Sequence, residues 1–396
     1  MTSRPRIAFV PPRFGRDVLG GAEAALREMA AGLHDRGYPV EVLTTCARSH
    51  FTWANELPAG RTVVDGITVH RFPTVMSHNR RERDELDAAV SAGATLTSEQ
   101  EQRWINGLFR VPALYEHILD HGGDYDALVF APYLFWTTFA CAQIHPEKSA
   151  LLSCLHDEPP ARLQVFRPLL TGLADVWFMS PPERDLAERI VGALPPHHAV
   201  TGCGVAVPAG YDTAAFRRRH GIEGRFVLYA GRREGGKGWE TLLEQFARAT
   251  SRRHLPFTLV TFGGGEVRAS SAIADRVVDL GFISESDKAD AFASADAYLQ
   301  PSRLEAFSRT IMEAWLAGSL VIANGASAVV SYHCERSGAG LLYDDEYELE
   351  ECLAFVADSP DAARAIAARG RDYVLANYTW DRVLDNIEPR LAALSA

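Results

Sequence analysis

Residues 297–320 read AYLQPSRLEAFSRTIMEAWLAGSL. The first four predict a buried strand, the polar residues after Pro301 predict a turn that carries Glu305, and the apolar spacing that follows predicts a helix that carries Glu313. Carboxylates form good hydrogen bonds to sugar hydroxyls. The stretch therefore predicts a strand, loop and helix unit that holds a phosphorylated sugar.

A second strand, Phe226 to Ala230, runs into the glycine-rich turn GRREGGKG, residues 231–238. This turn places Arg232 and Lys237 ahead of another helix. Arginine and lysine neutralise phosphate. Two carboxylates and two cations at strand ends indicate a nucleotide-sugar site better than either pair does alone.

Length and composition limit the number of domains and the kinds of function that the chain can have. A chain of 396 residues with 47% hydrophobic content predicts two domains. The formal net charge of -11 argues against wholesale binding of nucleic acid, which needs a basic surface. The six cysteines form no Cys-x-x-Cys pair, and no histidines cluster at metal-ligand spacing, so we expect no metal and mostly buried thiols in a reducing compartment.

Nothing in the sequence predicts export or a membrane span. Met1 to Arg6 lead directly into a strand without a signal-peptide pattern, and the most apolar run, Ala127 to Ile144, is broken by Pro132. We expect a cytoplasmic protein. Peripheral contact with the inner face of a membrane stays open, because Arg103 to Leu119 could seat on a membrane, although a core-facing amphipathic helix is favoured.

Strand-like runs alternate with helical ones in both halves, which predicts an α/β fold with parallel sheets covered on both faces. The strands expected in the first half are Ile7–Val10, Val40–Thr44, Thr68–Phe72, Ala127–Phe130, Ala150–Leu155, Val176–Met179 and Ala199–Thr201. Those expected in the second half are Phe226–Ala230, Thr258–Phe262, Val277–Leu280, Ala297–Gln300, Leu320–Ala323 and Gly340–Tyr343.

The uncharged, Pro- and Gly-rich segment Val191 to Tyr211 predicts a domain boundary near Val207, with domains 1–206 and 207–378. The polar segment Met76 to Arg103 is crowded with charges of both signs. We interpret it as an excursion from the first domain rather than core, and as a candidate lid on the acceptor side.

The reactive residue types follow strands, and open parallel sheets bind ligands outside the carboxyl ends of their strands. The residues in these positions are Gly20 and Gly21, His156 and Asp157, Arg232 and Lys237, Gly263 to Gly265, Phe282 and Ile283, and Glu305.

Together these residues resemble the family-4 retaining nucleotide-sugar glycosyltransferases, which have the GT-B fold of two Rossmann-like domains whose parallel sheets face each other across a cleft. The resemblance rests on Gly20-Gly21, Gly231-Arg232 through Lys237-Gly238, Phe262 to Gly265, Gly281 to Ile283, Pro301-Ser302 with Glu305 and Glu313, and Tyr378 to Asp381. It covers nearly the whole chain, and it is more specific in the second half. It also implies that a final helix, about 379–396, packs back on the first domain.

The resemblance implies a role for each acidic or basic residue of the site. Glu313 would bind the ribose hydroxyls, and Glu305 would hold hydroxyls of the transferred sugar. Arg232 and Lys237 would grip the donor diphosphate. His156 would contact the sugar. By default such glutamates and cations are solvated surface residues, and a lone histidine near an apolar strand is more often part of the core.

The resemblance also assigns backbone groups to the donor. The amides of Ser308, Arg309 and Thr310 would meet phosphate at a helix start. Gly20, Gly21, Gly263 and Gly264 would let the backbone approach the donor, and Phe282 and Ile283 would lie at the base. Glycines that merely ease a turn are the ordinary alternative.

Several features limit these assignments. No Gly-x-Gly-x-x-Gly follows the first strand, which disfavours a dehydrogenase. Asp124-Tyr125-Asp126 precedes a strand, so a turn is favoured over a metal site. The family often has glycine where this chain has Ala306 and Ser308. Cys203 stands where Asn commonly precedes the Gly-Val of the domain joint.

The function expected from the resemblance is transfer of a sugar from a nucleoside diphosphate sugar to a hydroxyl acceptor, with the anomeric configuration retained and without a metal cofactor. The acceptor would be a glycan, a lipid-linked glycan or a small metabolite. Two alternatives stay open: a GT-B subunit that binds a sugar nucleotide without turnover, and an epimerase or hydrolase of the same fold.

Overall fold

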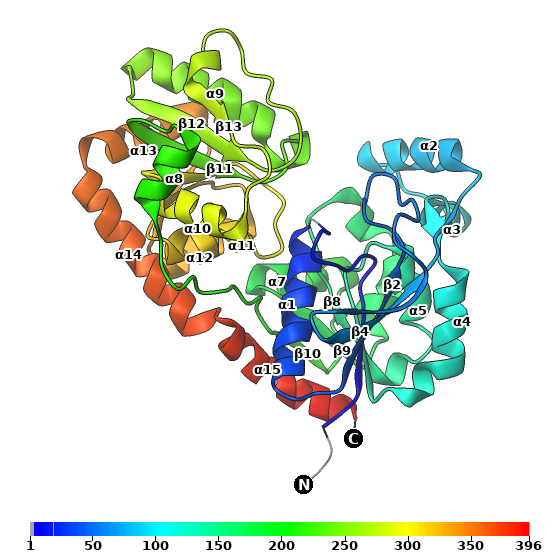
Figure 1. Ribbon diagram of the computed structural model, residues 1–396. Coiled ribbons are helices and arrows are strands. Elements are labelled where there is room, and N and C mark those ends of the chain that lie inside the picture. Colours follow the sequence, from blue (N-terminus) through cyan, green and yellow to red (C-terminus); the bar gives the residue numbers. More distant parts are fainter. Residues whose placement is uncertain (1–3, 19, 396) are drawn as a thin grey trace. The chain divides into compact units, whose positions relative to one another are not determined.

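The computed structural model describes residues 4–18 and 20–395 of the chain. It divides into two compact units, Met1–Gly204 with Trp380–Ala396, and Val205–Thr379. Each unit has its own sheet, with helices beside it (Figure 1). The boundary expected near Val207 lies close to this division.

The first unit contains an eight-stranded sheet in the order β10-β9-β8-β7-β1-β2-β4-β3. Its strands are β1 (Ile7–Val10), β2 (Val40–Thr45), β3 (Gly60–Val64), β4 (Ile67–Phe72), β7 (Ala127–Phe130), β8 (Ser149–Leu152), β9 (Asp175–Phe178) and β10 (His198–Val200). All pairs are parallel except β3 with β4. The sequence pattern missed β3, because this edge strand is almost entirely exposed and lacks a buried face.

Helices and short elements complete this unit. The helices are α1 (Gly21–Asp35), α2 (Arg80–Ser91), α3 (Ser98–Asn106), α4 (Pro112–His121), α5 (Trp136–Cys141), α6 (Arg167–Thr171), α7 (Pro181–Val191) and α15 (Trp380–Leu394). The 3-10 turns are η1 (Gly122–Asp124), η2 (Pro146–Lys148), η3 (Pro159–Arg162) and η4 (Gln164–Phe166), and β5 (Val75–Met76) pairs with β6 (Phe109–Arg110).

The segment expected to stand outside the core is partly core. Met76 to Arg103 forms α2 and leads into α3, and Leu86 and Val90 of α2 pack in the main hydrophobic cluster of this unit together with Trp104. The pattern was misread because most of α2 is polar and only this narrow face is buried. Arg103 to Leu119 is likewise not one helix, because β6 lies between α3 and α4.

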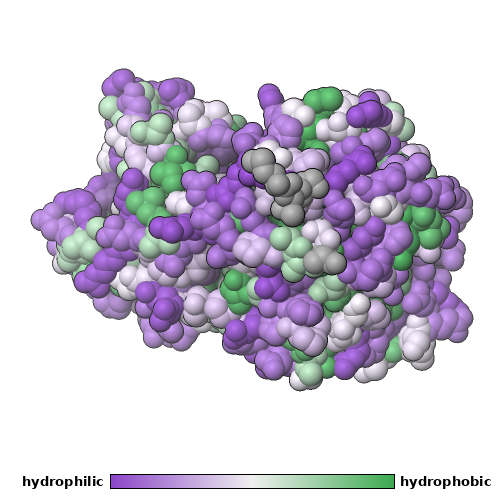
Figure 2. Space-filling model, turned by 90° about the horizontal axis from the view of Figure 1, so that it is seen from below, coloured by the Kyte–Doolittle hydropathy of each residue, from purple (hydrophilic) through white to green (hydrophobic). Residues whose placement is uncertain are grey.

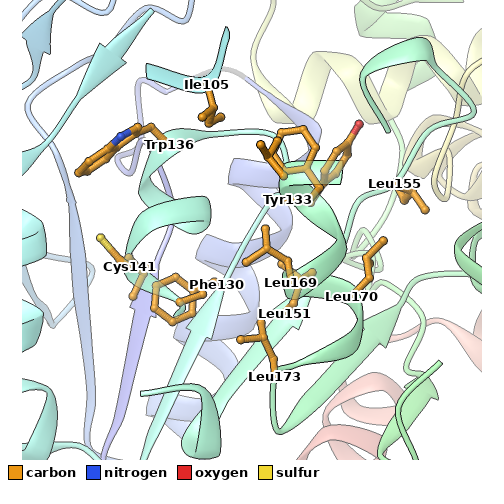
Figure 3. Close-up of a cluster of buried hydrophobic side chains, with 14 of the residues drawn as sticks. Ile105, Phe130, Tyr133, Trp136, Cys141, Leu151, Leu155, Leu169, Leu170 and Leu173 are labelled. Atoms are coloured by element: carbon orange, nitrogen blue, oxygen red, sulfur yellow. The ribbon is translucent and has the colours of Figure 1, made fainter. Parts of the chain in front are cut away.

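The same cluster fills the space beside β7 and β8. Figure 3 shows Phe130 and Leu151, which come from these strands, close to Leu169, Leu170 and Leu173 from the α6 region. All five side chains are almost completely removed from solvent. Burial of this kind is the main force that fixes the sheet against its helices.

The second unit contains a six-stranded, wholly parallel sheet in the order β13-β12-β11-β14-β15-β16. Its strands are β11 (Arg225–Ala230), β12 (Phe257–Phe262), β13 (Val277–Asp279), β14 (Ala297–Gln300), β15 (Leu320–Asn324) and β16 (Gly340–Tyr343). Its helices are α8 (Thr213–His220), α9 (Trp239–Arg253), α10 (Glu285–Ser294), α11 (Arg309–Leu316), α12 (Ala328–Ser337), α13 (Glu346–Asp358) and α14 (Pro360–Asn377), with 3-10 turns η5 (Gly235–Lys237) and η6 (Ala274–Arg276). The six strands expected here are confirmed, and so is the α/β class.

Candidate functional site

The strand order of the second sheet marks a ligand site before any side chain is considered. The chain proceeds outward from β11 to β12 and β13, then returns to the other side of β11 for β14, β15 and β16. Ligands of open parallel sheets bind where the order reverses, outside the carboxyl ends of the strands. The loops after β11 and β14, which carry Lys237 and Glu305, flank this reversal.

Lys237 and Glu305 are in direct contact. Lys237 Nζ donates to Glu305 Oε1 at 2.8 Å, and the two side chains are 24% and 13% exposed. Gln300, the last residue of β14, donates through Nε2 to the same carboxylate oxygen at 3.2 Å. The structure thus brings two of the predicted site residues together and adds Gln300, which the sequence analysis missed.

Gln300 also holds the start of α11. Its Nε2 lies 2.7 Å from Ser308 Oγ, and Ser308 has φ 66 and ψ 73, a left-handed conformation that favours glycine. Ser308 therefore adopts the backbone that a glycine would take at this position. The Ser308 side chain makes no cap hydrogen bond at the start of α11. The first N–H groups of an α-helix have no acceptor inside the helix.

Glu313 lies on α11 and pairs with a lysine that the sequence analysis missed. Lys288 Nζ of α10 donates to Glu313 Oε1 at 2.7 Å. Burial disfavours the charged ammonium, but Glu313 and Glu285 outweigh it and raise the pKa of Lys288. Glu313 Oε2 is buried and has no hydrogen-bond partner among the described residues. Lys288 thus fixes one carboxylate oxygen of Glu313, and the other oxygen can accept a hydrogen bond from a ligand.

The glycine-rich loops after β11 and β12 contact each other. Gly263 has φ 125, and a Cβ there would collide with the carbonyl oxygen of Gly231. Arg233 is buried and donates to the carbonyls of Gly263 and Gly265, both at 2.8 Å. Arg233 therefore holds the two loops together, a role that the sequence did not reveal.

The neighbouring Arg232 is different, because its side chain is half exposed and lies 3.1 Å from Glu234 Oε1. Phe282 is 68% exposed, and its ring lies against Gly264, where an added Cβ would be 3.3 Å away. Ile283, the next residue, is partly exposed. An exposed aromatic ring beside a bare backbone provides a flat surface for a planar group.

In the first unit the order reverses between β1 and β7, and the predicted Gly20 and Gly21 lie after β1. Gly20 has φ 156, and a Cβ there would collide with the Glu23 carboxylate. Glu23 forms a buried ion pair with Arg13, whose Nη1 donates to the carbonyl of Arg48 at 2.9 Å. The turn thus needs glycine for space. Arg13 and Glu23 are further residues that the sequence analysis missed.

His156 follows β8, which ends at Leu152 and not at the expected Leu155. The strand stops early because Cys154, with φ 51, turns the chain. Buried Glu183 accepts hydrogen bonds from Leu155 N and Ser153 Oγ, both at 2.6 Å, and so holds the loop. The His156 side chain is one-third exposed, and its Nδ1 lies 3.8 Å from Glu158 Oε1.

The His156 loop and the start of α1 lie at the same end of the first sheet. Burial raises the pKa of the Cys154 thiol, and Glu183, Cys203 and Glu23 act in the same direction. The Gly20-Gly21 turn follows β1 and the His156 loop follows β8, and the two strands run parallel in one sheet. The two predicted parts of the first unit, the Gly20-Gly21 turn and the His156 loop, occupy the same end of this sheet.

No group of three or more His, Cys, Asp or Glu side chains that could hold a metal ion occurs among the described residues. In the Asp124-Tyr125-Asp126 stretch, Asp126 Oδ2 accepts a bond from Arg6 N at 2.7 Å just before β7. The stretch is a strand lead-in. Five cysteines are buried and Cys352 is partly exposed, all as free thiols.

Of the helices formed by the described residues, none has the length and apolar character needed to cross a membrane. Figure 2 shows one face of the molecule, on which hydrophilic residues predominate and hydrophobic ones form small, separate groups.

The chain matches known proteins in sequence. Residues 232–388 match the family described as "Glycosyl transferase-like". Mannosylfructose-phosphate synthase of Agrobacterium fabrum is 26% identical over 173 residues, 37% of either protein. The D-inositol 3-phosphate glycosyltransferase of Pseudarthrobacter chlorophenolicus is 26% identical over 92% of this chain and 88% of that one. The first of these alignments thus spans well under half of the relative.

Solved structures share the fold along the whole chain. Sucrose-phosphate synthase from Thermosynechococcus elongatus superimposes with a TM-score of 0.75 at 18% identity, covering 98% of this chain and 99% of that one. HepE from Anabaena, solved with UDP and glucose, superimposes with a TM-score of 0.70 at 19% identity, covering 98% of this chain and 100% of that one.

The matches define what this chain resembles: its sequence is similar to glycosyltransferases, and it shares the GT-B fold with the solved structures.

Proposed function

We propose that the protein transfers a glycosyl group from a nucleoside diphosphate sugar to a hydroxyl acceptor, with the anomeric configuration retained. The observation that carries the proposal is the Lys237–Glu305 pair near the start of α11, at the point of strand-order reversal. A cation and a helix N-terminus attract a diphosphate, and the carboxylate can accept hydroxyl protons of the attached sugar.

Each predicted residue receives a role in this proposal. Lys237 and the exposed Arg232 neutralise the diphosphate, and the amides of Ser308, Arg309 and Thr310 donate to it. Glu313 uses its unpaired Oε2 to accept a bond from a ribose hydroxyl, while Lys288 keeps the other oxygen in place.

The remaining roles concern the base and the sugar. Phe282 and Ile283 lie against the base, beside Gly263 and Gly264, which let the backbone come close. In the first unit, His156 contacts the transferred sugar, and Gly20 and Gly21 allow close approach of the backbone to the donor phosphate. The UDP and glucose present in the HepE structure support a donor of this kind.

The proposed reaction balances without a protein nucleophile. The acceptor oxygen attacks the anomeric carbon from the face that the diphosphate leaves, the bond between that carbon and the phosphate oxygen breaks, and a donor phosphate oxygen takes the acceptor proton. Lys237, Arg232 and the α11 amides stabilise the charge that develops on the diphosphate. One well-placed donor of this kind accelerates such a step by roughly 10²- to 10³-fold.

A panel of UDP, GDP, ADP and dTDP in thermal-shift measurements tests donor binding first. A ligand at 100 times its dissociation constant stabilises the folded state by about 2.7 kcal/mol. The matching nucleotide sugar is then incubated with mixed hydroxyl acceptors, and the released nucleoside diphosphate is measured. Release only in the presence of acceptor supports transfer.

The second candidate is a subunit that binds the donor without turnover. Ala306 and Ser308 favour it, because the resembled family often has glycine at both positions and a Cβ there limits how closely the backbone can approach the phosphate. Calorimetric binding of a nucleotide sugar with no consumption under any acceptor would select this candidate. Conversion of the sugar nucleotide without acceptor would select the epimerase or hydrolase.

A further inference from the structure

A cavity lies in the first unit, next to the loop that leads to Gly20 and Gly21. It has a volume of about 300 Å³. Arg16 reaches it from the loop after β1, Arg48 from the loop after β2, and Arg71 from the end of β4. Asp17 and Asp65 also line it. We refer to it as the Arg71 pocket.

Arg71 is the unusual member of this group. Its side chain is only 6% exposed, and Nη1 donates to the carbonyl of Phe14 at 2.8 Å. Among the described residues no carboxylate pairs with it. Burial lowers the pKa of Arg71, and only the Cys46 thiol acts in the opposite direction. An arginine nonetheless stays protonated, so the pocket contains a buried positive charge without a counterion.

The two carboxylates at the pocket do not supply that counterion. Asp65 is bound by Arg16 and also lies 3.9 Å from Arg27 Nη1. Asp17 is exposed and solvated. Arg48 is exposed too, and no ion pair to it is found among the described residues. With Arg16 paired to Asp65, the remaining charged lining residues are Arg48, Arg71 and Asp17, so the net charge at the cavity is positive by one.

A buried guanidinium that lacks a counterion is costly to the fold. Proteins keep such groups where they recognise planar or tetrahedral anions, since the guanidinium fork matches carboxylate and phosphate oxygens. A volume near 300 Å³ is at the small end of ligand sites and suits a monosaccharide-sized molecule better than a long glycan.

The position of the pocket indicates which substrate would occupy it. Gly15 to Val18 line the pocket, and Gly20 and Gly21 belong to the same loop after β1. That loop is the part of this unit proposed to approach the donor phosphate. A molecule in the pocket would therefore lie beside the loop that is proposed to meet the donor phosphate, which suits an acceptor.

We propose that the Arg71 pocket binds the anionic group, a phosphate or a carboxylate, of a small polyhydroxy acceptor, with Arg71 and Arg48 as its ligands. The role of this molecule as acceptor rests on the proposed function. The binding of an acidic sugar at this place does not, and it can be measured without turnover.

Calorimetric titration of the full chain tests the proposal. The probes are a hexose 6-phosphate, a hexuronate, the unsubstituted hexose and inorganic phosphate. Arg48→Gln and Arg71→Gln are compared with wild type and with Arg189→Gln, a matched control because Arg189 is exposed on α7 and outside the pocket. UDP, GDP, ADP and dTDP are titrated into every variant as a separate arm.

The expected result is that one acidic sugar binds at least about 10-fold more tightly than the neutral hexose. Arg48→Gln should weaken it about 10-fold and Arg71→Gln further, while Arg189→Gln leaves it unchanged. The phosphate and hexuronate arms show which anion is preferred. If Arg71→Gln fails to fold, the exposed Arg48→Gln decides the matter.

Acidic sugars that bind no better than the hexose, or that bind Arg48→Gln as tightly as wild type, overturn the proposal. This failure is distinct from failure of the proposed function. In the first case a nucleoside diphosphate still binds and only the acidic sugar does not. In the second no nucleotide binds, and Arg48-dependent binding of an acidic sugar still establishes the anion site.

Discussion

Lys237 Nζ lies 2.8 Å from Glu305 Oε1, so the residue proposed to hold the diphosphate and the residue proposed to hold the sugar form one ion pair. Both side chains are largely buried. A donor that binds here must share the lysine with the carboxylate. The pair thus sets the position of both groups in advance, which lowers the cost of organising them around the donor.

Replacing Lys237 by Ala should chiefly slow turnover. The developing charge on the diphosphate loses a fixed cation, and we expect kcat to fall by roughly 10²- to 10³-fold with a smaller change in KM. Steady-state kinetics with the matched donor measures this. Arg218→Ala, an exposed position on α8, is the control and should behave as wild type. Equal kinetics for Lys237→Ala and wild type would remove Lys237 from the site.

Replacing Glu313 by Ala should weaken binding of the nucleoside. A hydrogen bond to a charged group contributes about 1.5–3 kcal/mol, which corresponds to a Kd roughly 10- to 100-fold higher. Lys288→Met should weaken binding in the same direction, because it frees the carboxylate that Lys288 fixes. Calorimetry with the nucleoside diphosphate measures both. Glu335→Ala, exposed on α12, should bind normally, and normal binding by Glu313→Ala contradicts the ribose assignment.

Ser308 allows a test of the glycine-like backbone. A left-handed conformation costs a residue with Cβ about 1–2 kcal/mol, so Ser308→Gly should offset the loss of the Gln300 bond and leave Tm close to that of wild type. Ser308→Ala keeps the strain and loses the bond, so its Tm should fall. Thermal unfolding compares the two. A Ser308→Gly variant less stable than Ser308→Ala would show that backbone strain is not the controlling factor.

Glu183 predicts a specific dependence of stability on pH. Burial raises the pKa of Glu183 to about 7, from an ordinary value of 4.5. Between these values the folded chain keeps a proton that the unfolded chain has lost. The contribution of Glu183 to the free energy of unfolding should therefore be most favourable below pH 4.5. It should decrease as the pH rises to about 7 and stay constant above that value. The change is at most about 3 kcal/mol.

Denaturant unfolding at several pH values measures this contribution. Glu183→Gln should flatten the curve over this window, although its amide nitrogen cannot accept the bond from Met179 N and overall stability will drop. Glu188→Gln, exposed on the same helix, should keep the wild-type slope. An identical slope for wild type and Glu183→Gln would rule out Glu183 as the titrating group.

Local patterns sufficed for much of this architecture. The strands of the second sheet were recognisable because each is a short apolar run, and all but β16 are followed within two residues by Gly or Pro. Lys237 and Glu305 lie in the loops that follow two of these runs. β3 could not be recognised, since it is exposed and depends on pairing with β4. The end of β8 was misplaced because a left-handed Cys154 leaves no signal in the sequence.

Contacts between residues that are distant in the sequence could not be predicted from local sequence patterns. Lys288 contacts Glu313 from a different helix. Arg232 and Arg233 are indistinguishable in the sequence, but in the structure Arg233 is buried and Arg232 is half exposed. The Arg71 pocket needs the ends of three strands to meet, and none of the three local sequences points to it. Pairings of this kind require the strand order, which the sequence alone left open.

The most direct test of the central claim is release of nucleoside diphosphate from the matched nucleotide sugar, measured with acceptor, in the presence of a chelator, for wild type and Lys237→Ala. The account predicts undiminished release by wild type, a product with the donor's anomeric configuration, and a loss of roughly 10²-fold in the variant. Activity abolished by the chelator, or equal release by both proteins, would contradict it.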